Sequence, residues 1–332
     1  MQFSIVAGNV LTMLAFMLCG YLLVAFKKGT SAHAKTLSAI LIYLCCPAMI
    51  VSAWQSIQYS KDNFLQTAWF FCVSLIIQLL FFGALFFVFR KKLRNTPVPQ
   101  LADQQTDQLK EGDNQKKDES AKYRLLTVGA TLGNVGFFGL PLVTALFPEQ
   151  PTVACFSTVY VMSMNLMVFT VGVFMLTGDK KHVSIKSAII NPSTLSVLFA
   201  LPFFFFEITF PTFLLQPLDL LGKMSTPLCM MVLGMRLASA NKKNLFTRPT
   251  VYLGCLLKLI VFPLFAYALV AFLPFFDATF KACILVLSAT PSGVIILSLA
   301  EFHETEQELS ANIVLLSTLL ATVTMPLIML VL

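Results

Sequence analysis

Residues 131–147 read TLGNVGFFGLPLVTALF, and residues 287–297 read LSATPSGVIIL. Both stretches are apolar enough to lie in a membrane, yet both carry glycine and proline in the middle of the run. Glycine and proline loosen a helix and free backbone groups that lipid cannot satisfy. Such interruptions persist only where they face protein or a water-filled cavity. The two stretches therefore predict a pair of interrupted membrane helices inside a polytopic protein.

The composition of the whole chain agrees with a membrane protein. Of 332 residues, 57% are hydrophobic and 12% are charged, whereas soluble chains average about 45–50% apolar and about 25% charged residues. So little charge cannot cover a water-facing surface, which excludes an ordinary soluble domain. The net charge of +7 is explained by membrane orientation rather than by nucleic-acid binding, so no nucleic-acid partner is expected.

Ten apolar segments reach the length of about 20 residues that a membrane helix needs. The joints between them are short, except for residues 91–122, which are hydrophilic with mixed charge and are predicted to form a disordered cytoplasmic loop. The chain is thus expected to be all-α and surrounded by the lipid bilayer. The predicted spans, numbered 1 to 10, are 4–26, 36–57, 64–89, 123–147, 152–177, 187–206, 212–238, 250–273, 279–300 and 309–332.

The basic residues orient these spans. Nineteen of the 23 Lys and Arg residues lie in or beside the joints that follow odd-numbered spans. Because basic residues favour cytoplasmic loops, these joints are expected inside a cell (inner or plasma) membrane, with both termini extracytoplasmic. Trp54 and Trp69 flank the joint 58–63 and are expected to anchor the outer interface.

The prolines divide the ten spans into two halves of five. Pro47 and Pro227 are 180 residues apart, whereas Pro141 and Pro291 are 150 apart. The 30-residue difference matches the extra length of the loop 91–122. Five spans per half give the halves opposite topology, as in the inverted repeats of many secondary transporters, where interrupted helices at corresponding positions mark the transport site.

An anion site is expected where the two interruptions meet. If each helix breaks at the bilayer midplane, Pro141 and Pro291 lie near N-terminal ends of the second half-helices, whose positive dipole ends and free N–H groups suit an anion. A proline-kinked packing helix is the alternative for one span alone, but the matched pair favours the site. The candidate substrate-binding residues are Asn134, Gly136, Pro141, Thr290, Pro291, Ser292, Gly293 and Asn165.

Several of these polar residues have a structural alternative. The amide of Asn134 can donate to a carboxylate or cap a helix. The hydroxyls of Thr290 and Ser292 can bind substrate or satisfy freed carbonyls. Asn165 can instead join two helices by a hydrogen bond.

Ionisable residues inside a span are functional hypotheses by default. Lys258 lies in the inner half of span 8, where it can attract an anion or extend toward the cytoplasmic face. Asp219 is four residues from Lys223 and is expected to pair with it in a structural role. With Gln78 of span 3, Lys258 and Asp219 are the candidates for coupling or charge, whereas His303, at the end of span 9, is expected to be solvated.

Motifs of other protein classes are absent. The sequence has no HExxH, GxSxG or GxxxxGK[ST] motif, and among its eight cysteines there is no CxxC pair. An aspartyl dyad needs two intramembrane Asp residues, and only Asp219 qualifies. The chain is therefore predicted not to be an enzyme, with no catalytic residue, metal or cofactor.

Three elements resemble the auxin efflux carrier family, and specifically its bacterial branch of malate and malonate permeases. They are GNVGFFGLPL (133–142), STPLCMMVLGMRLA (225–238) and the ending ATPSGVIILSLAEF…ELSANIVLLSTLLATVTMP (289–326). The resemblance covers nearly the whole chain in order. It implies a ten-span fold of the bile-acid:sodium symporter type, in which spans 4 and 9 cross as broken helices.

The resemblance further implies two repeats, residues 1–177 and 187–332, and two functional parts. Spans 1, 2, 6 and 7 are implied to form a scaffold that dimerises, and spans 3–5 and 8–10 a transport domain that moves in an elevator-like motion. The implied activity is secondary-active or facilitative transport of a small organic anion such as malate. Two alternatives stay open: a sodium-coupled symporter of the bile-acid type, which the lack of acidic residues at the breaks disfavours, and a receptor-like sensor on a transporter fold.

Overall fold

The computed structural model describes residues 2–93, 111–177, 180–240, 242–303 and 305–331, and every regular element within these ranges is helical. Among them, seven helical segments are long and apolar enough to cross a membrane: Phe3–Ala25, Ala32–Gln55, Lys61–Leu93, Thr152–Thr177, Thr212–Ser239, Pro249–Ala271 and Gln307–Val331. Three shorter apolar helices fall within predicted spans 4, 6 and 9. The all-α, multi-pass character is confirmed, while the ten-span inverted repeat stays a prediction.

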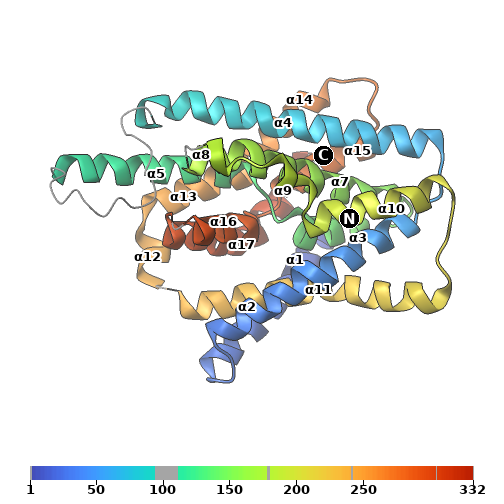
Figure 1. Ribbon diagram of the computed structural model, residues 1–332, viewed down its shortest axis with the longest axis horizontal. Coiled ribbons are helices and arrows are strands. Elements are labelled where there is room, and N and C mark those ends of the chain that lie inside the picture. Colours follow the sequence, from blue (N-terminus) through green and yellow to red (C-terminus); the bar gives the residue numbers. More distant parts are fainter. Residues whose placement is uncertain (1, 94–110, 178–179, 241, 304, 332) are drawn as a thin grey trace.

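The elements follow one another as Figure 1 shows, with π-helical turns (η1, η2, η3, η5) and 3₁₀ turns (η4, η6) between α-helices. Their bounds are α1 Gln2–Ala25, α2 Ser31–Ile40, η1 Leu41–Cys45, α3 Cys46–Gln55, α4 Lys61–Leu93, α5 Glu111–Thr131, η2 Val135–Gly139, α6 Leu140–Leu146, α7 Thr152–Met167, η3 Val168–Gly172, α8 Val173–Thr177, η4 Lys180–His182, α9 Ile185–Ile189, α10 Pro192–Phe205, α11 Thr212–Ser239, α12 Lys242–Thr247, α13 Pro249–Leu256, η5 Leu257–Val261, α14 Phe262–Ala271, α15 Ala278–Ala289, α16 Val294–Phe302, α17 Gln307–Ile328 and η6 Met329–Val331.

Three of the π-helical turns end two residues before a proline: η1 before Pro47, η2 before Pro141 and η5 before Pro263. A proline has no N–H, and its ring crowds the carbonyl four residues earlier. The wider π turn makes room for that ring without ending the helix. Before Pro141 the carbonyl left without its helical partner is that of Phe137, and the Thr226 hydroxyl of α11 donates to it at 2.8 Å.

The π turn η2 separates Pro141 from the interruption of the first helix. The chain leaves the helix at residues 132–134, between α5 and η2, and again at residues 290–293, between α15 and α16. Pro291 lies within the second interruption, whereas Pro141 follows the first by seven residues. Pro141 lies inside α6, because the preceding π turn absorbs its ring.

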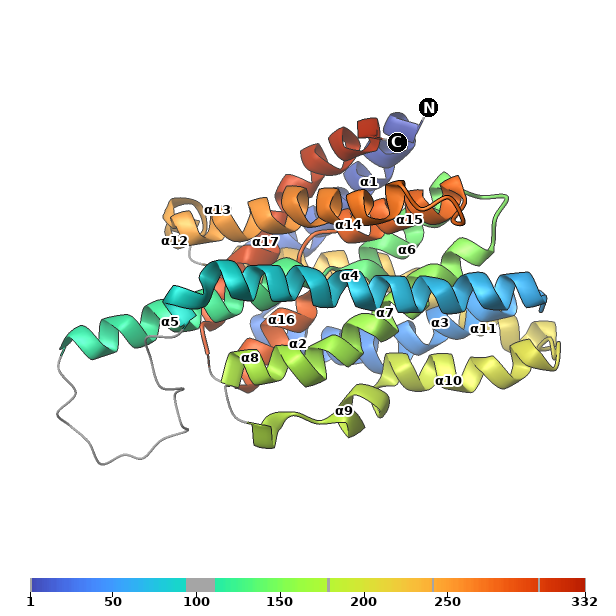
Figure 2. The same ribbon diagram turned by 90° about the horizontal axis from the view of Figure 1, so that it is seen from above.

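The helices α1 and α11 touch backbone to backbone. A Cβ atom at Gly20 would clash with the backbone carbonyl of Met231, and one at Gly234 with the carbonyl of Met17. Small residues permit this approach between membrane helices. Figures 1 and 2 also place the start of α1 beside the end of the α17–η6 segment, so these elements are neighbours although they lie far apart in sequence.

The prediction of a disordered loop over residues 91–122 is wrong at both of its ends. The helix α4 continues to Leu93 and α5 already begins at Glu111, while residues 94–110 lie outside the described residues. The ammonium of Lys92 pairs with the carboxylate of Glu119 at 2.6 Å, which joins the two helices. Hydrophilic composition indicated a loop here because these helices extend beyond their apolar segments.

The prediction of interfacial anchors is wrong for one of the two tryptophans and stays a prediction for the other. Trp69 is exposed, but Trp54 is 3% exposed and donates from Nε1 to the hydroxyl of Thr158 at 3.0 Å. The ring of Trp54 also packs edge-on against Phe204, with 5.2 Å between centroids. Trp54 is thus a core residue with a satisfied N–H rather than an interfacial anchor.

Candidate transport site

The two interruptions meet and form one unit, which we call the crossover (residues 132–134 and 290–293). Gly133 and Ser292 face each other as an isolated antiparallel bridge. Backbone groups freed by a broken helix need partners in a low-dielectric interior, and here each break supplies partners to the other. The two backbone hydrogen bonds are 2.7 Å from Asn134 N to Pro291 O and 3.1 Å from Gly293 N to Leu132 O.

The crossover is too tight for a side chain at Gly293. A Cβ atom there would lie 2.8 Å from the carbonyl oxygen of Gly133 and 3.5 Å from the backbone nitrogen of Asn134. Since the nearer atom is backbone, no rotamer change relieves the contact.

Gly293→Ala is therefore expected to lower stability by about 1–3 kcal/mol, the usual range for overpacking a core. Thermal unfolding of the purified protein in detergent measures the effect. The matched control is Gly83→Ala in α4, where a Cβ atom meets nothing within 4 Å and alanine is the better helix former. Equal melting temperatures for the two variants would contradict the tight crossover.

Asn134 caps η2 with its backbone and not with its side chain. Its carbonyl accepts from Phe138 N at 3.0 Å and from Gly139 N at 3.2 Å, but its side chain makes no cap hydrogen bond. Among the described residues, the side-chain amide donates only to the thiol of Cys229 at 3.8 Å, which is a weak acceptor. The amide of Asn134, 4% exposed, thus retains hydrogen-bonding capacity at the positive end of a half-helix.

The hydroxyl groups of the second break serve the backbone. Thr290 Oγ1 donates to Leu287 O at 2.8 Å, and Ser292 Oγ lies 3.4 Å from Gly129 O. The backbone N–H of Ser292 is in turn bound by the hydroxyl of Ser317 at 3.0 Å. These hydroxyls could bind substrate or satisfy freed carbonyls, and the hydrogen bonds observed are those to backbone carbonyls.

Lys258 brings its side-chain nitrogen to the crossover. It is fully buried, and its Nζ donates to the carbonyl oxygen of Ser288 at 2.7 Å, in the last turn of α15. The ammonium also lies 4.5 Å from the ring centroid of Phe262 and 3.1 Å from where a Cβ on Gly133 would be. In the described part of the chain no carboxylate pairs with it. The expectation that Lys258 reaches the cytoplasmic face is wrong, because η5 holds it against the end of α15.

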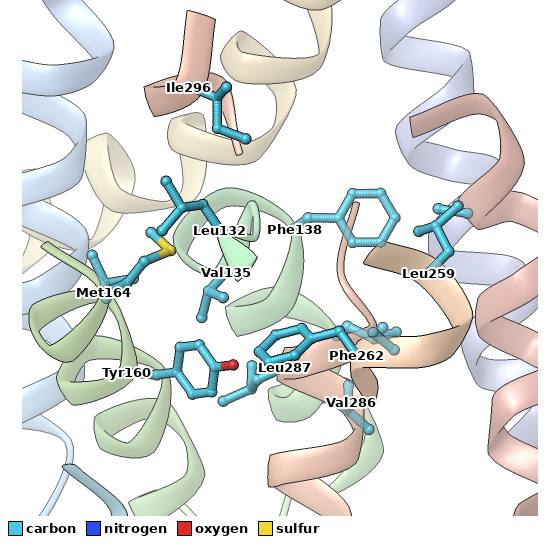
Figure 3. Close-up of a cluster of buried hydrophobic side chains, with 14 of the residues drawn as sticks. Leu132, Val135, Phe138, Tyr160, Met164, Leu259, Phe262, Val286, Leu287 and Ile296 are labelled. Atoms are coloured by element: carbon cyan, nitrogen blue, oxygen red, sulfur yellow. The ribbon is translucent and has the colours of Figure 1, made fainter. Parts of the chain in front are cut away.

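Apolar side chains enclose the crossover. Figure 3 shows Leu132, Val135 and Phe138 together with Leu287 of α15 and Phe262 of α14, all of them buried. Such surroundings exclude water and lower the local dielectric, which strengthens the field of the ammonium and of the helix ends.

The comparison with known proteins agrees with this architecture. The sequence profile of the family described as "Membrane transport protein" matches residues 116–329, which include both sides of the crossover. The chain belongs to this family. It is also similar to an uncharacterized transporter of Methanocaldococcus jannaschii, with 27% identity over 321 residues and 93% of each chain covered. The resemblance to the auxin efflux carrier family is thereby confirmed, and a transport role is supported over a catalytic one.

In this membrane transport protein, Gln78 belongs to a polar cluster between α4 and α7. Its Nε2 donates to Ser163 Oγ at 3.0 Å, and the Ser74 hydroxyl lies 2.9 Å from the same oxygen. The Oε1 atom of Gln78 and the hydroxyl of Tyr160 are buried and have no hydrogen-bond partner among the described residues. Figure 3 places Tyr160 beside Val135 and Leu287, so it adds a buried hydroxyl near the crossover, for which the sequence carried no signal.

Two other candidates have structural partners. Asn165 donates to the side-chain oxygen of Asn191 at 3.1 Å, and Asn191 caps the start of α10. Asp219 pairs with Lys223 as predicted, and both side chains are exposed, at 47% and 72%. A Cβ on Gly136, by contrast, would lie 3.6 Å from its nearest neighbours, so no close approach requires glycine there.

His303 is half-buried rather than solvated. Its ring packs edge-on against that of His182, with 5.5 Å between centroids, at the end of α16. Burial, and then the charge of His182, hold the pKa of His303 below its ordinary value of 6.5. The folded protein therefore favours the neutral imidazole.

Stability is accordingly expected to fall as the pH drops from above 6.5 toward the lowered pKa of His303, because the unfolded chain binds that proton more tightly. Melting temperatures at pH 7.5 and pH 5.0 give the slope. His303→Gln is expected to flatten it, whereas His33→Gln, at the start of α2 and away from this pair, serves as the control. A slope that His303→Gln leaves unchanged would rule out this contribution.

Proposed function

We propose that this membrane transport protein is a secondary-active or facilitative carrier of small organic anions, carboxylates of the malate class, in the cell membrane. The observation that carries the proposal is the buried ammonium of Lys258 at the crossover, which no described carboxylate pairs. Nζ lies near Gly133, and the next residue, Asn134, carries a side-chain amide that makes no cap bond. An ammonium, an amide and the N–H groups of two half-helices all favour an anion over a cation.

The proposed movement is of the elevator type, with spans 1, 2, 6 and 7 as a dimerising scaffold and spans 3–5 and 8–10 as the transport domain. The backbone contact between α1 and α11 supports a scaffold that does not slide internally. The segment from the crossover through η2 lies on the proposed transport domain and, among the described residues, makes two side-chain hydrogen bonds with α11. Those contacts are the bond from Thr226 to Phe137 O and the amide of Asn134 on Cys229.

The sodium-coupled alternative is less favoured at this site. A sodium ion needs several oxygen ligands, and the crossover segments 132–134 and 290–293 contain no acidic residue that could supply carboxylate oxygens. The ammonium already supplies positive charge at the crossover.

A panel of organic acids and amines, screened by thermal shift, tests the substrate class. A ligand that binds only the folded protein raises the melting temperature with its concentration. Dicarboxylates are expected to stabilise the protein and then to drive counterflow in proteoliposomes, equally in sodium and in choline buffer. Stabilisation by amines alone would exclude the anion carrier, sodium dependence would restore the symporter, and binding without counterflow would favour a sensor.

A further inference from the structure

A cavity of about 310 Å³ lies between the two parts, at the ends of α11 and α16 that the basic residues assign to the cytoplasm. Its lining is mostly apolar, with charged residues at the rim. The lining residues used in the argument are Lys35 of α2, Leu233 and Arg236 of α11, Leu297 and Glu301 of α16, and Glu308 of α17.

The cavity lies on the approach to the crossover. On α11, Arg236, Leu233 and Cys229 are spaced by three and four residues and so share one helix face, and Cys229 contacts the amide of the crossover. On α16, Glu301 and Leu297 follow the crossover at the same four-residue spacing. Seven or eight residues of helix correspond to roughly 11 Å, so two helical turns separate the cavity from the candidate site.

Arg236 and Glu301 form an ion pair across this cavity. Arg236 donates from one terminal nitrogen to Glu301 Oε1 at 2.9 Å, and its side chain is 19% exposed. The Nε of Arg236 is buried and has no partner among the described residues. A guanidinium carries five donors in a fork that suits a carboxylate, so this pair leaves part of the fork unused.

The other carboxylate of the cavity is held differently. Glu308 accepts from Arg248 at 3.0 Å and from the amide of Asn244 at 2.6 Å. Both partners lie at the α12–α13 side and not on the scaffold helix α11. Glu308 is thus a carboxylate in the same cavity that does not occupy Arg236.

We propose that Arg236 is a docking site for carboxylates on the cytoplasmic approach, which Glu301 occupies as an internal substitute until a substrate carboxylate displaces it. The proposal rests on the proposed function for the identity of the natural ligand. Arg236 lies on the proposed scaffold and Glu301 on the proposed transport domain. Displacement of Glu301 by a substrate carboxylate therefore also breaks an ion pair that joins the two parts.

The test uses a cysteine in the cavity, Leu297→Cys, with Ala311→Cys on α17 as a second position if the first variant folds poorly. In inverted membrane vesicles, rates of labelling by an anionic and by a cationic methanethiosulfonate are compared, after subtraction of the parent chain. Arg236→Gln is expected to lower the anionic-to-cationic ratio at least about fivefold, and Glu301→Gln to raise it at least about fivefold.

Matched controls separate docking from the general charge of the cavity. Glu308→Gln and Lys35→Gln remove one carboxylate and one ammonium from the same cavity and are expected to change the ratio less than about twofold. If Glu308→Gln matched Glu301→Gln, or Lys35→Gln matched Arg236→Gln, the effect would be a general potential and the docking site would be refuted.

Protection of the same cysteine by malate separates the two proposals. If malate protects the cysteine, more strongly in Glu301→Gln and not at all in Arg236→Gln, both the docking site and the proposed substrate class are supported. If another carboxylate protects and malate does not, Arg236 still docks carboxylates and the malate class of the proposed function is wrong. If no carboxylate protects, the docking site is refuted.

Discussion

Asn134→Ala is expected to abolish substrate counterflow in proteoliposomes while the protein stays folded. The cap of η2 survives because the backbone carbonyl of Asn134, and not its side chain, makes the cap bonds. What disappears is the amide donor at the positive end of a half-helix. A hydrogen bond to a charged group contributes about 1.5–3 kcal/mol, so substrate affinity should fall roughly 10- to 150-fold.

Two control variants accompany this prediction. One replaces another asparagine, and the other keeps the side-chain shape of Asn134. Asn165→Ala removes an amide that holds Asn191, so it should lower the melting temperature and retain counterflow. Asn134→Asp keeps the shape and adds a negative charge that repels an anion. Its loss of anion binding should therefore be at least as large as that of Asn134→Ala. Wild-type counterflow in Asn134→Ala would remove Asn134 from the site.

Lys258→Met is expected to eliminate anion transport with little loss of stability. Methionine fills a similar volume without charge, and burying an ammonium without a carboxylate partner is unfavourable in itself. The melting temperature is therefore expected to stay within a few degrees of the wild type or to rise, whereas transport should fall by about two orders of magnitude or more.

Lys281→Met is the matched control for Lys258→Met. Lys281 Nζ donates to the carbonyl oxygen of Ala271 at 3.0 Å, so it too binds a helix-end carbonyl from a partly buried position. It lies at the opposite end of α15 from the crossover, and its loss should leave transport intact. Equal transport defects in the two lysine variants would show that the carbonyl contact, and not the charge at the crossover, is what matters.

Much of the fold follows from short-range features of the sequence. Apolar segment length located the membrane helices, and Gly/Pro content located the two interruptions. The π turn before Pro141 had no hydropathy signature, because it depends on how one ring meets one carbonyl. Trp54 was misplaced for a similar reason, since its partner Thr158 is about a hundred residues away in sequence.

The site was predictable only where a polar residue sits inside a break. Asn134 met that condition, and the structure places it at the crossover. Lys258 was singled out by its charge, but its depth depends on where the end of α15 crosses η5. Tyr160 and Cys229 carried no signal, because a tyrosine or cysteine in an apolar run is ordinary core until a second helix brings it to the crossover.

The glycine contact between α1 and α11 also bears on biosynthesis. Roughly 210 residues separate Gly20 from Gly234, so at roughly 5–20 residues per second α11 leaves the ribosome some 10–40 s after α1. During that interval the glycine face of α1 has no partner, and the first helix to enter the bilayer must wait for the seventh predicted span. Substitutions at either glycine should thus appear first as poor yield of inserted protein, before any transport assay can be made.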